Sequence, residues 1–198
     1  AQVCRDYLQQ RQITQDSIAR FNIGFAPDSW QWITDLAKGT PYPHELLERI
    51  GVVKKSDKGR YYDIFRGRVM FPIHDNSGRC IALGGRILPE FTTEHTPKYV
   101  NSPESLLFKK SKELYGLDLA MDSIRKDRNV FIMEGYTDVI MASQLGVTNV
   151  LAVLGTAIGQ QHLKRLRGIA DTVVLVLDGD EAGQRRTSEV LDLFIRGQ

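Results

Sequence analysis

The run Val130-Phe131-Ile132-Met133, followed directly by Glu134-Gly135, indicates how the second half of the chain folds. Four consecutive apolar residues of this kind are typical of a strand buried on both faces of a sheet. The same order, an apolar run and then a helical pattern, recurs twice more along the chain. The predicted elements are strands at 130–133, 150–154 and 173–177 and helices at 137–145, 158–167 and 181–195. This alternation predicts an α/β domain whose parallel sheet is covered by helices.

The chain before this domain has a different pattern, with short helices and antiparallel strands. Apolar runs at 69–73 and 80–83 flank the turn sequence Asp75-Asn76-Ser77-Gly78, which predicts a β-hairpin. The pair Gly84-Gly85 follows, where a strand bends or another part of the backbone approaches closely. We therefore predict an α+β subdomain over 1–113, followed by the α/β domain over 114–198.

Short helical patterns fill the first fifty residues. Thr14 is the expected N-cap of a helix over 15–21. Apolar residues recur at helical spacing in the next two helical patterns and are predicted to belong to the core: Trp30, Ile33, Leu36, Ala37, Leu46, Leu47 and Ile50.

The charges of the 198 residues are unevenly distributed although the net charge is only +2. Residues 53–112 hold 12 of the 26 Lys and Arg residues and 6 of the 24 Asp and Glu residues. A basic region beside an acidic remainder suits a protein that binds a polyanion and metal cations. No apolar run is long enough for a transmembrane helix. Cys4 and Cys80 are too far apart for a CxxC pair, and the four histidines form no metal-like cluster, so no zinc site is expected.

Acidic residues follow two of the three predicted strands. Glu134 comes directly after the first strand, and Asp178 and Asp180 come after the third. Because the carboxyl ends of parallel strands meet at one edge of a sheet, we expect these carboxylates to converge. Converging carboxylates repel one another unless cations lie between them, and oxygen ligands suit Mg²⁺ or Mn²⁺. A single acid such as Asp138, at the start of a helix, is also a common helix cap.

Two of these stretches resemble the signature motifs of the Toprim domain, which primases, topoisomerases and some nucleases share. They are Glu134-Gly135-Tyr136-Thr137-Asp138-Val139 and Leu177-Asp178-Gly179-Asp180-Glu181-Ala182-Gly183. Upstream stretches are similar, in the same order, to motifs of the bacterial replicative primase family. The most specific of them is Pro97-Lys98-Tyr99-Val100-Asn101-Ser102-Pro103-Glu104, and the others lie at 65–73, 84–86, 108–110 and 114–116.

The resemblance implies DNA-dependent synthesis of RNA primers from ribonucleoside triphosphates on a single-stranded DNA template. It implies that Glu134, Asp178 and Asp180 are catalytic and hold Mg²⁺ or Mn²⁺, with Asp138 as a further acid near the metal. It also implies nucleotide or nucleic-acid binding by a set of polar and basic residues: Arg11, Arg66, Arg68, Arg86, Lys98, Asn101 and Lys110.

The family also carries a zinc-ribbon domain and a helicase-binding domain, which this chain does not contain. The chain is thus expected to be a fragment whose Toprim sheet lacks its last strand, and to contact the replicative helicase only through the absent domain. A cytoplasmic place at the replication fork, with no membrane contact, is implied. Two alternatives stay open. One is a Toprim-type, metal-dependent nuclease, and the other is a non-catalytic fragment that binds single-stranded DNA or nucleotides.

Overall fold

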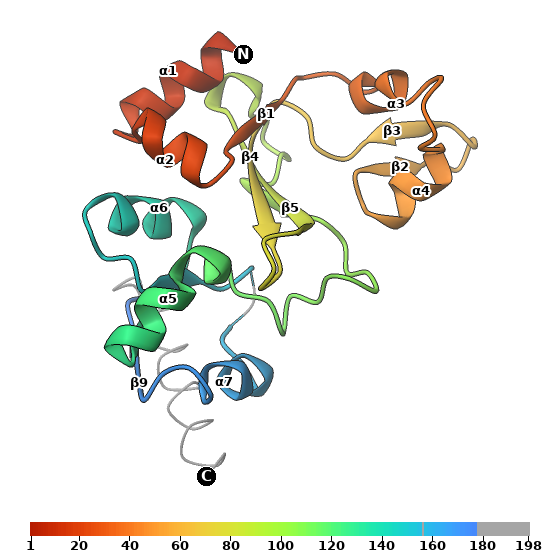
Figure 1. The fold of residues 1–198 in the computed structure, drawn as a ribbon. Helices are drawn as coiled ribbons and strands as arrows, with labels where there is room; N and C mark the ends of the chain where they lie inside the picture. The colour runs from red at the N-terminus through yellow and green to blue at the C-terminus, as the bar shows by residue number, and fades with distance from the viewer. Residues whose placement is uncertain (156, 178–198) are drawn as a thin grey trace. The chain divides into compact units, whose positions relative to one another are not determined.

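The computed structural model describes residues 1–155 and 157–177, and they form two compact units. The N-terminal unit comprises residues 1–73 and 80–108, and the C-terminal unit comprises residues 74–79 and 109–198. Each unit has its own sheet (Figure 1). The helix predicted at 181–195 lies outside the described residues.

An antiparallel sheet organises the N-terminal unit. Its four strands lie in the order β1-β4-β5-β6. Their bounds are Gly24–Ala26 for β1, Arg68–His74 for β4, Cys80–Ile87 for β5 and Tyr99–Asn101 for β6. β4 and β5 confirm the predicted hairpin. Its turn is closed by the carboxylate of Asp75, which accepts from the backbone N–H groups of Ser77 and Arg79 at 2.9 and 3.1 Å.

The strand β1 is an element that the sequence analysis did not predict. Gly24–Ala26 pairs with β4, so that Gly24 lies opposite Met70 and Ala26 opposite Arg68. Three residues that begin with glycine and precede Pro27 carry no alternating pattern of their own. The strand exists because β4 offers it a partner, which a local pattern does not reveal.

The N-terminal unit also contains short helices, and a small hairpin lies next to two of them. The helices are α1 (Gln2–Gln10), α2 (Gln15–Arg20), α3 (Trp32–Leu36), α4 (His44–Arg49) and the 3-10 turn η1 (Pro89–Phe91), and the hairpin strands, which lie next to α3 and α4, are β2 (Val53–Lys55) and β3 (Tyr61–Asp63). The predicted cap of α2 is confirmed, since the Thr14 side chain accepts from the backbone N–H of Ser17 at 3.2 Å.

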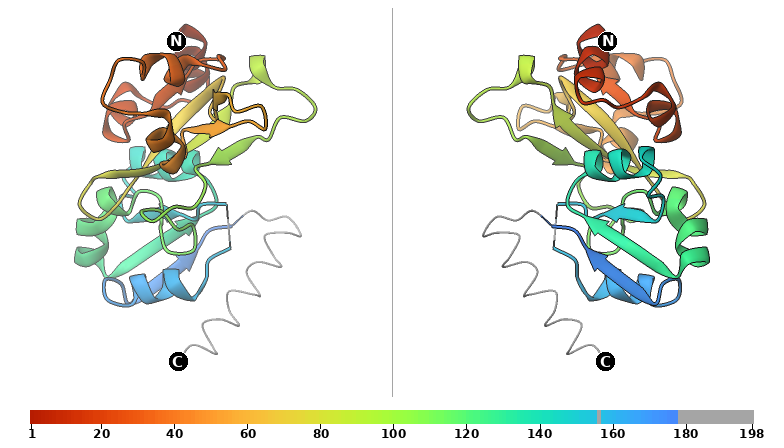
Figure 2. Two further views of the ribbon diagram at one scale, coloured as in Figure 1. Left: turned by 90° about the vertical axis from the view of Figure 1, so that its right-hand side faces the viewer. Right: turned by 90° about the vertical axis from the view of Figure 1, so that its left-hand side faces the viewer.

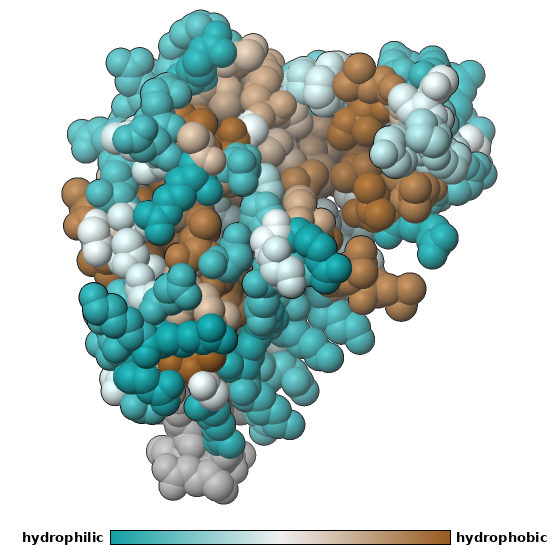
Figure 3. Space-filling view, viewed as in Figure 1, coloured by the Kyte–Doolittle hydropathy of each residue, from teal (hydrophilic) through white to brown (hydrophobic). Residues whose placement is uncertain are grey.

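The predicted core position is confirmed for Leu47, which is buried, and was wrong for Trp30, Leu36, Leu46 and Ile50. The side chains of these four are 61%, 59%, 37% and 44% exposed. Figure 3 shows hydrophobic surface over the part of the N-terminal unit that holds α3 and α4. These helices have only five and six residues and lie beside a two-stranded sheet. Because so small a sheet covers only part of each helix, some of the apolar residues at helical spacing stay exposed.

A parallel sheet organises the C-terminal unit, as predicted. Its strands lie in the order β8-β7-β9, and their bounds are Val150–Ala152, Asn129–Met133 and Thr172–Leu175. The helices of this unit are α5 (Leu117–Asp127), α6 (Tyr136–Gln144) and α7 (Gln160–Leu166). Figure 2 shows the three strands with these helices around them. Within the described residues, no helix has the length and apolar character needed to cross a membrane.

The core of the C-terminal unit forms between one face of this sheet and two of its helices. Val130 and Ile132 are 0% and 1% exposed, and their spacing of two residues puts both on the same face of β7. They belong to one apolar cluster with residues of α5, α7 and β8: Leu117, Ala120, Ile124, Leu163, Leu166 and Leu151. A strand buried in this way leaves its ends as the places for polar groups.

Gly85 in β5 provides a test of close packing in the N-terminal unit. A Cβ at this position would lie 2.8 Å from a ring carbon of Phe65 and 3.0 Å from Cδ of Arg68. We expect Gly85→Ala to lower the free energy of unfolding by about 1–3 kcal/mol, because neither neighbour is free to withdraw. Gly24→Ala is the matched control, since its Cβ would meet Met70 at an ordinary 3.7 Å. Equal urea midpoints for the two variants would contradict this packing.

Candidate active site

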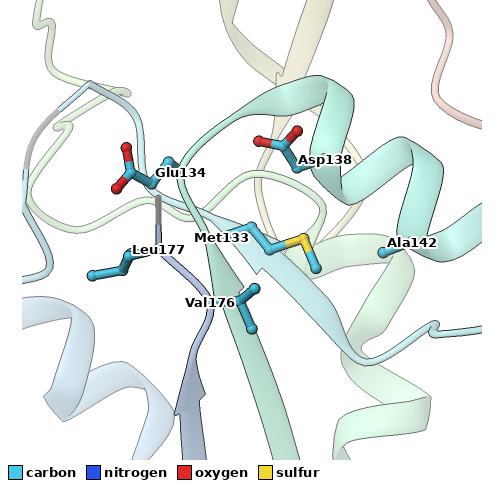
Figure 4. A pocket seen from close by; sticks show the side chains of 6 residues that line it. All are labelled: Met133, Glu134, Asp138, Ala142, Val176 and Leu177. Atoms are coloured by element: carbon cyan, nitrogen blue, oxygen red, sulfur yellow. The ribbon is translucent and has the colours of Figure 1, made fainter. Parts of the chain in front are cut away.

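Two neighbouring strands of the parallel sheet end side by side at a small hollow. Ile132 of β7 lies opposite Leu175 of β9, and the backbone N–H of Val176 donates to the Ile132 carbonyl at 2.8 Å. The chain therefore leaves both strands at the same edge. The hollow there has a volume of about 260 Å³ and is lined by Met133, Glu134, Asp138, Ala142, Val176 and Leu177 (Figure 4).

Two predicted acidic residues share this hollow. Glu134 is the first residue after β7, and Asp138 lies in the first turn of α6. Gly135, the N-cap of α6, separates them in the sequence. A Cβ on Gly135 would lie 2.8 Å from Oδ2 of Asp138, so the missing side chain leaves room for this carboxylate. The structure thus brings Glu134 and Asp138 together, and both contribute only oxygen atoms as possible ligands.

The other two predicted acids, Asp178 and Asp180, lie outside the described residues. The last described residue before them, Leu177, lines the same hollow as Glu134. Among residues 1–155 and 157–177, no group of three or more His, Cys, Asp or Glu side chains is arranged to hold a metal ion. The described part of the hollow therefore supplies a pair of carboxylates.

Arg68, one of the predicted basic residues, is held inside the N-terminal unit. It is 4% exposed, and its guanidinium donates to the carbonyl oxygens of Gly85, Lys98 and Pro97 at 3.1, 3.4 and 3.0 Å. Burial lowers the pKa of this guanidinium, and the charge of Arg66 adds to the effect. The contacts of Arg68 in this structure fix the backbone that leads into β6.

Arg11 and Arg86 lie over one aromatic ring. The guanidinium carbon of Arg11 is 5.5 Å from the centroid of the Tyr7 ring, and that of Arg86 is 5.2 Å from it. Arg86 also donates to the hydroxyl of Tyr99 at 3.3 Å. Cation–π contacts of this kind keep guanidinium groups in place without neutralising their charge. The sequence analysis did not anticipate this arrangement.

The remaining predicted residues of the N-terminal unit are Arg66, Lys98 and Asn101. The guanidinium carbon of Arg66 lies 3.3 Å from the centroid of the Trp30 ring. Lys98 precedes β6, and its carbonyl accepts from the backbone N–H of Ile87 at 3.0 Å. Asn101 ends β6, where it lies opposite Gly84 of β5. Six of the seven predicted binding residues thus belong to this unit.

Lys110 belongs to the C-terminal unit, and the backbone around it is bound to α7. Its carbonyl oxygen lies 3.0 Å from Nε2 of His162, and Nη1 of Arg165 donates to the carbonyl of Lys112 at 2.9 Å. His162 was assigned no function from the sequence, because a single histidine in a helical pattern gives no sign of its partner fifty residues earlier.

Comparisons with known proteins agree with this arrangement of elements and motifs. Residues 1–121 match the family described as DNA primase catalytic core, N-terminal domain. The chain belongs to this primase family. Residues 128–197 match the Toprim domain, and this range includes Glu134 and Asp138 of the hollow. The Toprim fold also agrees with the parallel sheet and its helices.

Several relatives are primases from different bacteria. The DNA primase of Legionella pneumophila is 40% identical over 191 residues, which are 96% of this chain and 32% of that protein. The DNA primase of Escherichia coli strain K12 is 41% identical over 180 residues, which are 91% of this chain and 30% of that protein. The chain thus spans about a third of the length of these relatives.

Solved structures of primase catalytic domains have the same fold. A primase catalytic domain bound to single-stranded DNA is 39% identical and superposes with a TM-score of 0.86 over 96% of this chain and 60% of that one. The RNA polymerase domain of the Mycobacterium tuberculosis primase is 35% identical, with a TM-score of 0.88 over 97% of this chain and 64% of that one.

Arg68 offers a test of the support that it gives to the backbone before β6. We expect Arg68→Met to lower the free energy of unfolding by about 2–3 kcal/mol, because buried carbonyl groups lose a charged donor. Arg79→Met is the control, since Arg79 forms an exposed ion pair with Asp75, and such pairs contribute little to stability. Urea denaturation of the two variants makes the comparison. If Arg68→Met has the same urea midpoint as the parent protein, the contacts of Arg68 with the carbonyl groups do not stabilise the unit.

Proposed function

We propose that this chain is part of a DNA primase and takes part in joining ribonucleotides into an RNA primer on a single-stranded DNA template. The observation that carries the proposal is the shared hollow of Glu134 and Asp138, at the edge where two parallel strands end. The comparisons with known proteins support the proposal, because residues 1–121 match the primase catalytic core and residues 128–197 match the Toprim domain.

The reaction joins two nucleotides at a phosphate. The 3′-hydroxyl oxygen of the growing primer attacks the α-phosphorus of the incoming triphosphate. The bond from that phosphorus to the bridging oxygen breaks, pyrophosphate leaves, and the hydroxyl proton passes to a base or to water. Negative charge therefore grows on the attacking and leaving oxygens, and a catalyst must neutralise it.

The carboxylates of the hollow fit a divalent cation of the hard, oxygen-preferring kind, Mg²⁺ or Mn²⁺. Glu134 and Asp138 would hold it, together with Asp178 and Asp180 of the second acidic motif. When bound, such a cation neutralises charge on the phosphate oxygens. Glu134 follows β7 directly, so its carboxylate is fixed to a rigid element, and proton transfer by Glu134 is a second role compatible with this place.

The basic residues divide into those that contact nucleic acid or triphosphate and one that supports them. We assign contacts with phosphate to Arg11, Arg66, Arg86, Lys98 and Lys110, and a hydrogen bond to a base or ribose to Asn101. Arg68 supports Lys98 through its bonds to carbonyl groups. Contact of the primase with the replicative helicase and a place at the cytoplasmic replication fork belong to the same proposal.

Template-directed ribonucleotide incorporation tests this proposal. The assay supplies a single-stranded DNA template, the four ribonucleoside triphosphates and either Mg²⁺ or Mn²⁺. Two parent proteins are assayed: this chain, and this chain continued with the following part of the Escherichia coli catalytic core. Each parent is compared with its Asp178→Ala and Asp138→Ala variants. The matched control is Asp171→Ala, whose exposed carboxylate pairs with Arg128 away from the hollow.

We expect RNA synthesis by the continued chain, a loss of at least about a hundredfold in Asp178→Ala, and near-parental synthesis in Asp171→Ala. RNA synthesis that survives both Asp178→Ala and Asp138→Ala would overturn the proposal. Cleavage of the template in place of synthesis would identify a nuclease, and metal-independent binding without synthesis would identify a binding module.

Gly135 tests the link between Asp138 and the metal. We expect Gly135→Ala to weaken Mn²⁺ binding about tenfold, because the new Cβ would displace the Asp138 carboxylate. The melting temperature should stay within about 2 °C, since only a side-chain end has to move. Gly168→Ala is the control, with no atom near its Cβ. Titration calorimetry with Mn²⁺ measures both variants, and equal affinities would show that Asp138 does not hold the ion.

A further inference from the structure

The imidazole of His162 lies in the interior of the C-terminal unit and uses both of its ring nitrogens. The residue is 0% exposed. Its Nδ1 lies 3.0 Å from the backbone nitrogen of Gly159, and its Nε2 lies 3.0 Å from the carbonyl oxygen of Lys110. A backbone N–H only donates and a carbonyl only accepts. The ring is therefore held as the neutral tautomer with its proton on Nε2.

The surroundings of the ring favour this neutral form. Burial lowers the pKa of His162 below its usual value of 6.5, and the hydrogen bond to the Lys110 carbonyl acts in the opposite direction. The charged groups near the ring are Arg165, which lowers the pKa, and Glu113, which raises it. The ring is neutral at pH 7, so Nδ1 keeps the lone pair that accepts from Gly159.

A second side chain of α7 holds the same segment. Arg165, three residues after His162 and thus on the same face of the helix, donates from Nη1 to the Lys112 carbonyl at 2.9 Å and to Oε2 of Glu113 at 2.6 Å. The backbone N–H groups of Lys112 and Glu113 both donate to the Lys109 carbonyl, at 2.9 and 3.1 Å. Residues 109–113 therefore form a hydrogen-bonded turn that is fixed to α7.

The other bond of His162 reaches the connection that leaves the sheet. Gly159 is the N-cap of α7 and follows β8, and Ala152 at the end of β8 lies opposite Met133 at the end of β7. This is the edge at which Glu134 leaves the sheet. The His162 imidazole thus links the backbone of Lys110 to the segment between β8 and α7. That segment begins at the sheet edge where Glu134 lies.

We propose that His162 is a positioning residue for nucleotide binding. It fixes the backbone from which Lys110 extends, and so sets where the Lys110 ammonium meets the triphosphate. This inference rests on the proposed function, in which Lys110 binds nucleotide. A lysine ammonium sits on a flexible four-carbon stem, so its average position depends on how well its backbone is held.

A double-mutant cycle tests the coupling. Calorimetry measures the binding of GTP in the presence of Mg²⁺ to the parent, to His162→Leu, to Lys110→Ala and to the variant with both changes. We expect His162→Leu to weaken GTP binding about tenfold in the parent and by less than twofold once Lys110 is alanine. His162→Gln should recover part of the loss, because its amide can still donate to the Lys110 carbonyl.

Arg128→Gln is the control for general destabilisation of the same unit. Arg128 pairs with Asp171 and binds the Ile169 carbonyl at the other end of α7, so its loss should leave GTP affinity unchanged. A loss of affinity in Arg128→Gln equal to that in His162→Leu would overturn the inference. So would a full tenfold effect of His162→Leu in the Lys110→Ala background.

A measurement without nucleotide separates this inference from the proposed function. Nitrogen chemical shifts of the His162 ring should report a protonated Nε2, and His162→Leu should speed hydrogen exchange at the Lys112 and Glu113 amides. Unchanged exchange overturns the positioning role alone, even where the parent binds GTP. If exchange is faster in His162→Leu but the parent itself fails to bind GTP, the proposed function is overturned, and the assignment of Lys110 with it.

Discussion

A parallel sheet that is buried between helices leaves its strand ends as the places where charged side chains can reach water, and the chemistry of this chain depends on that constraint. Val130 and Ile132 are almost wholly buried, so a carboxylate within β7 would lose its hydration without compensation. Glu134, one residue beyond the strand, avoids this cost. Since β7 and β9 run parallel and in register, the next residues of both strands arrive at one hollow.

Elements with a complete local pattern were predictable from the sequence. The hairpin of β4 and β5 has two apolar runs and an Asp-containing turn, and α2 has a threonine cap. The strand β1 was missed because its three residues pair only through β4. The exposure of Trp30 and Leu36 was missed for a related reason. Helical spacing shows which residues share a face, and only the tertiary structure decides whether another element covers that face.

The part of the candidate site that lies at the ends of the parallel strands was predictable from the sequence. Glu134 and Asp138 were expected at one edge, and the structure places them around one hollow. The basic residues could be chosen from motifs, but their contacts could not, because those contacts join distant segments. Arg68 reaches carbonyl groups about thirty residues later, and His162 reaches one about fifty residues earlier. No spacing rule connects such pairs.

The two lysines of the predicted binding set are anchored in the same way in two separate units. The carbonyl of Lys98 accepts from buried Arg68, and the carbonyl of Lys110 accepts from buried His162. In both cases a buried donor holds the backbone of the lysine and leaves its ammonium to other contacts. An arginine can fix its own geometry with five donors, whereas a lysine carries a point charge on a flexible stem. A lysine that must meet a phosphate at a defined place therefore needs its backbone held by another residue, and that requirement gives Arg68 and His162 a common physical reason for being buried.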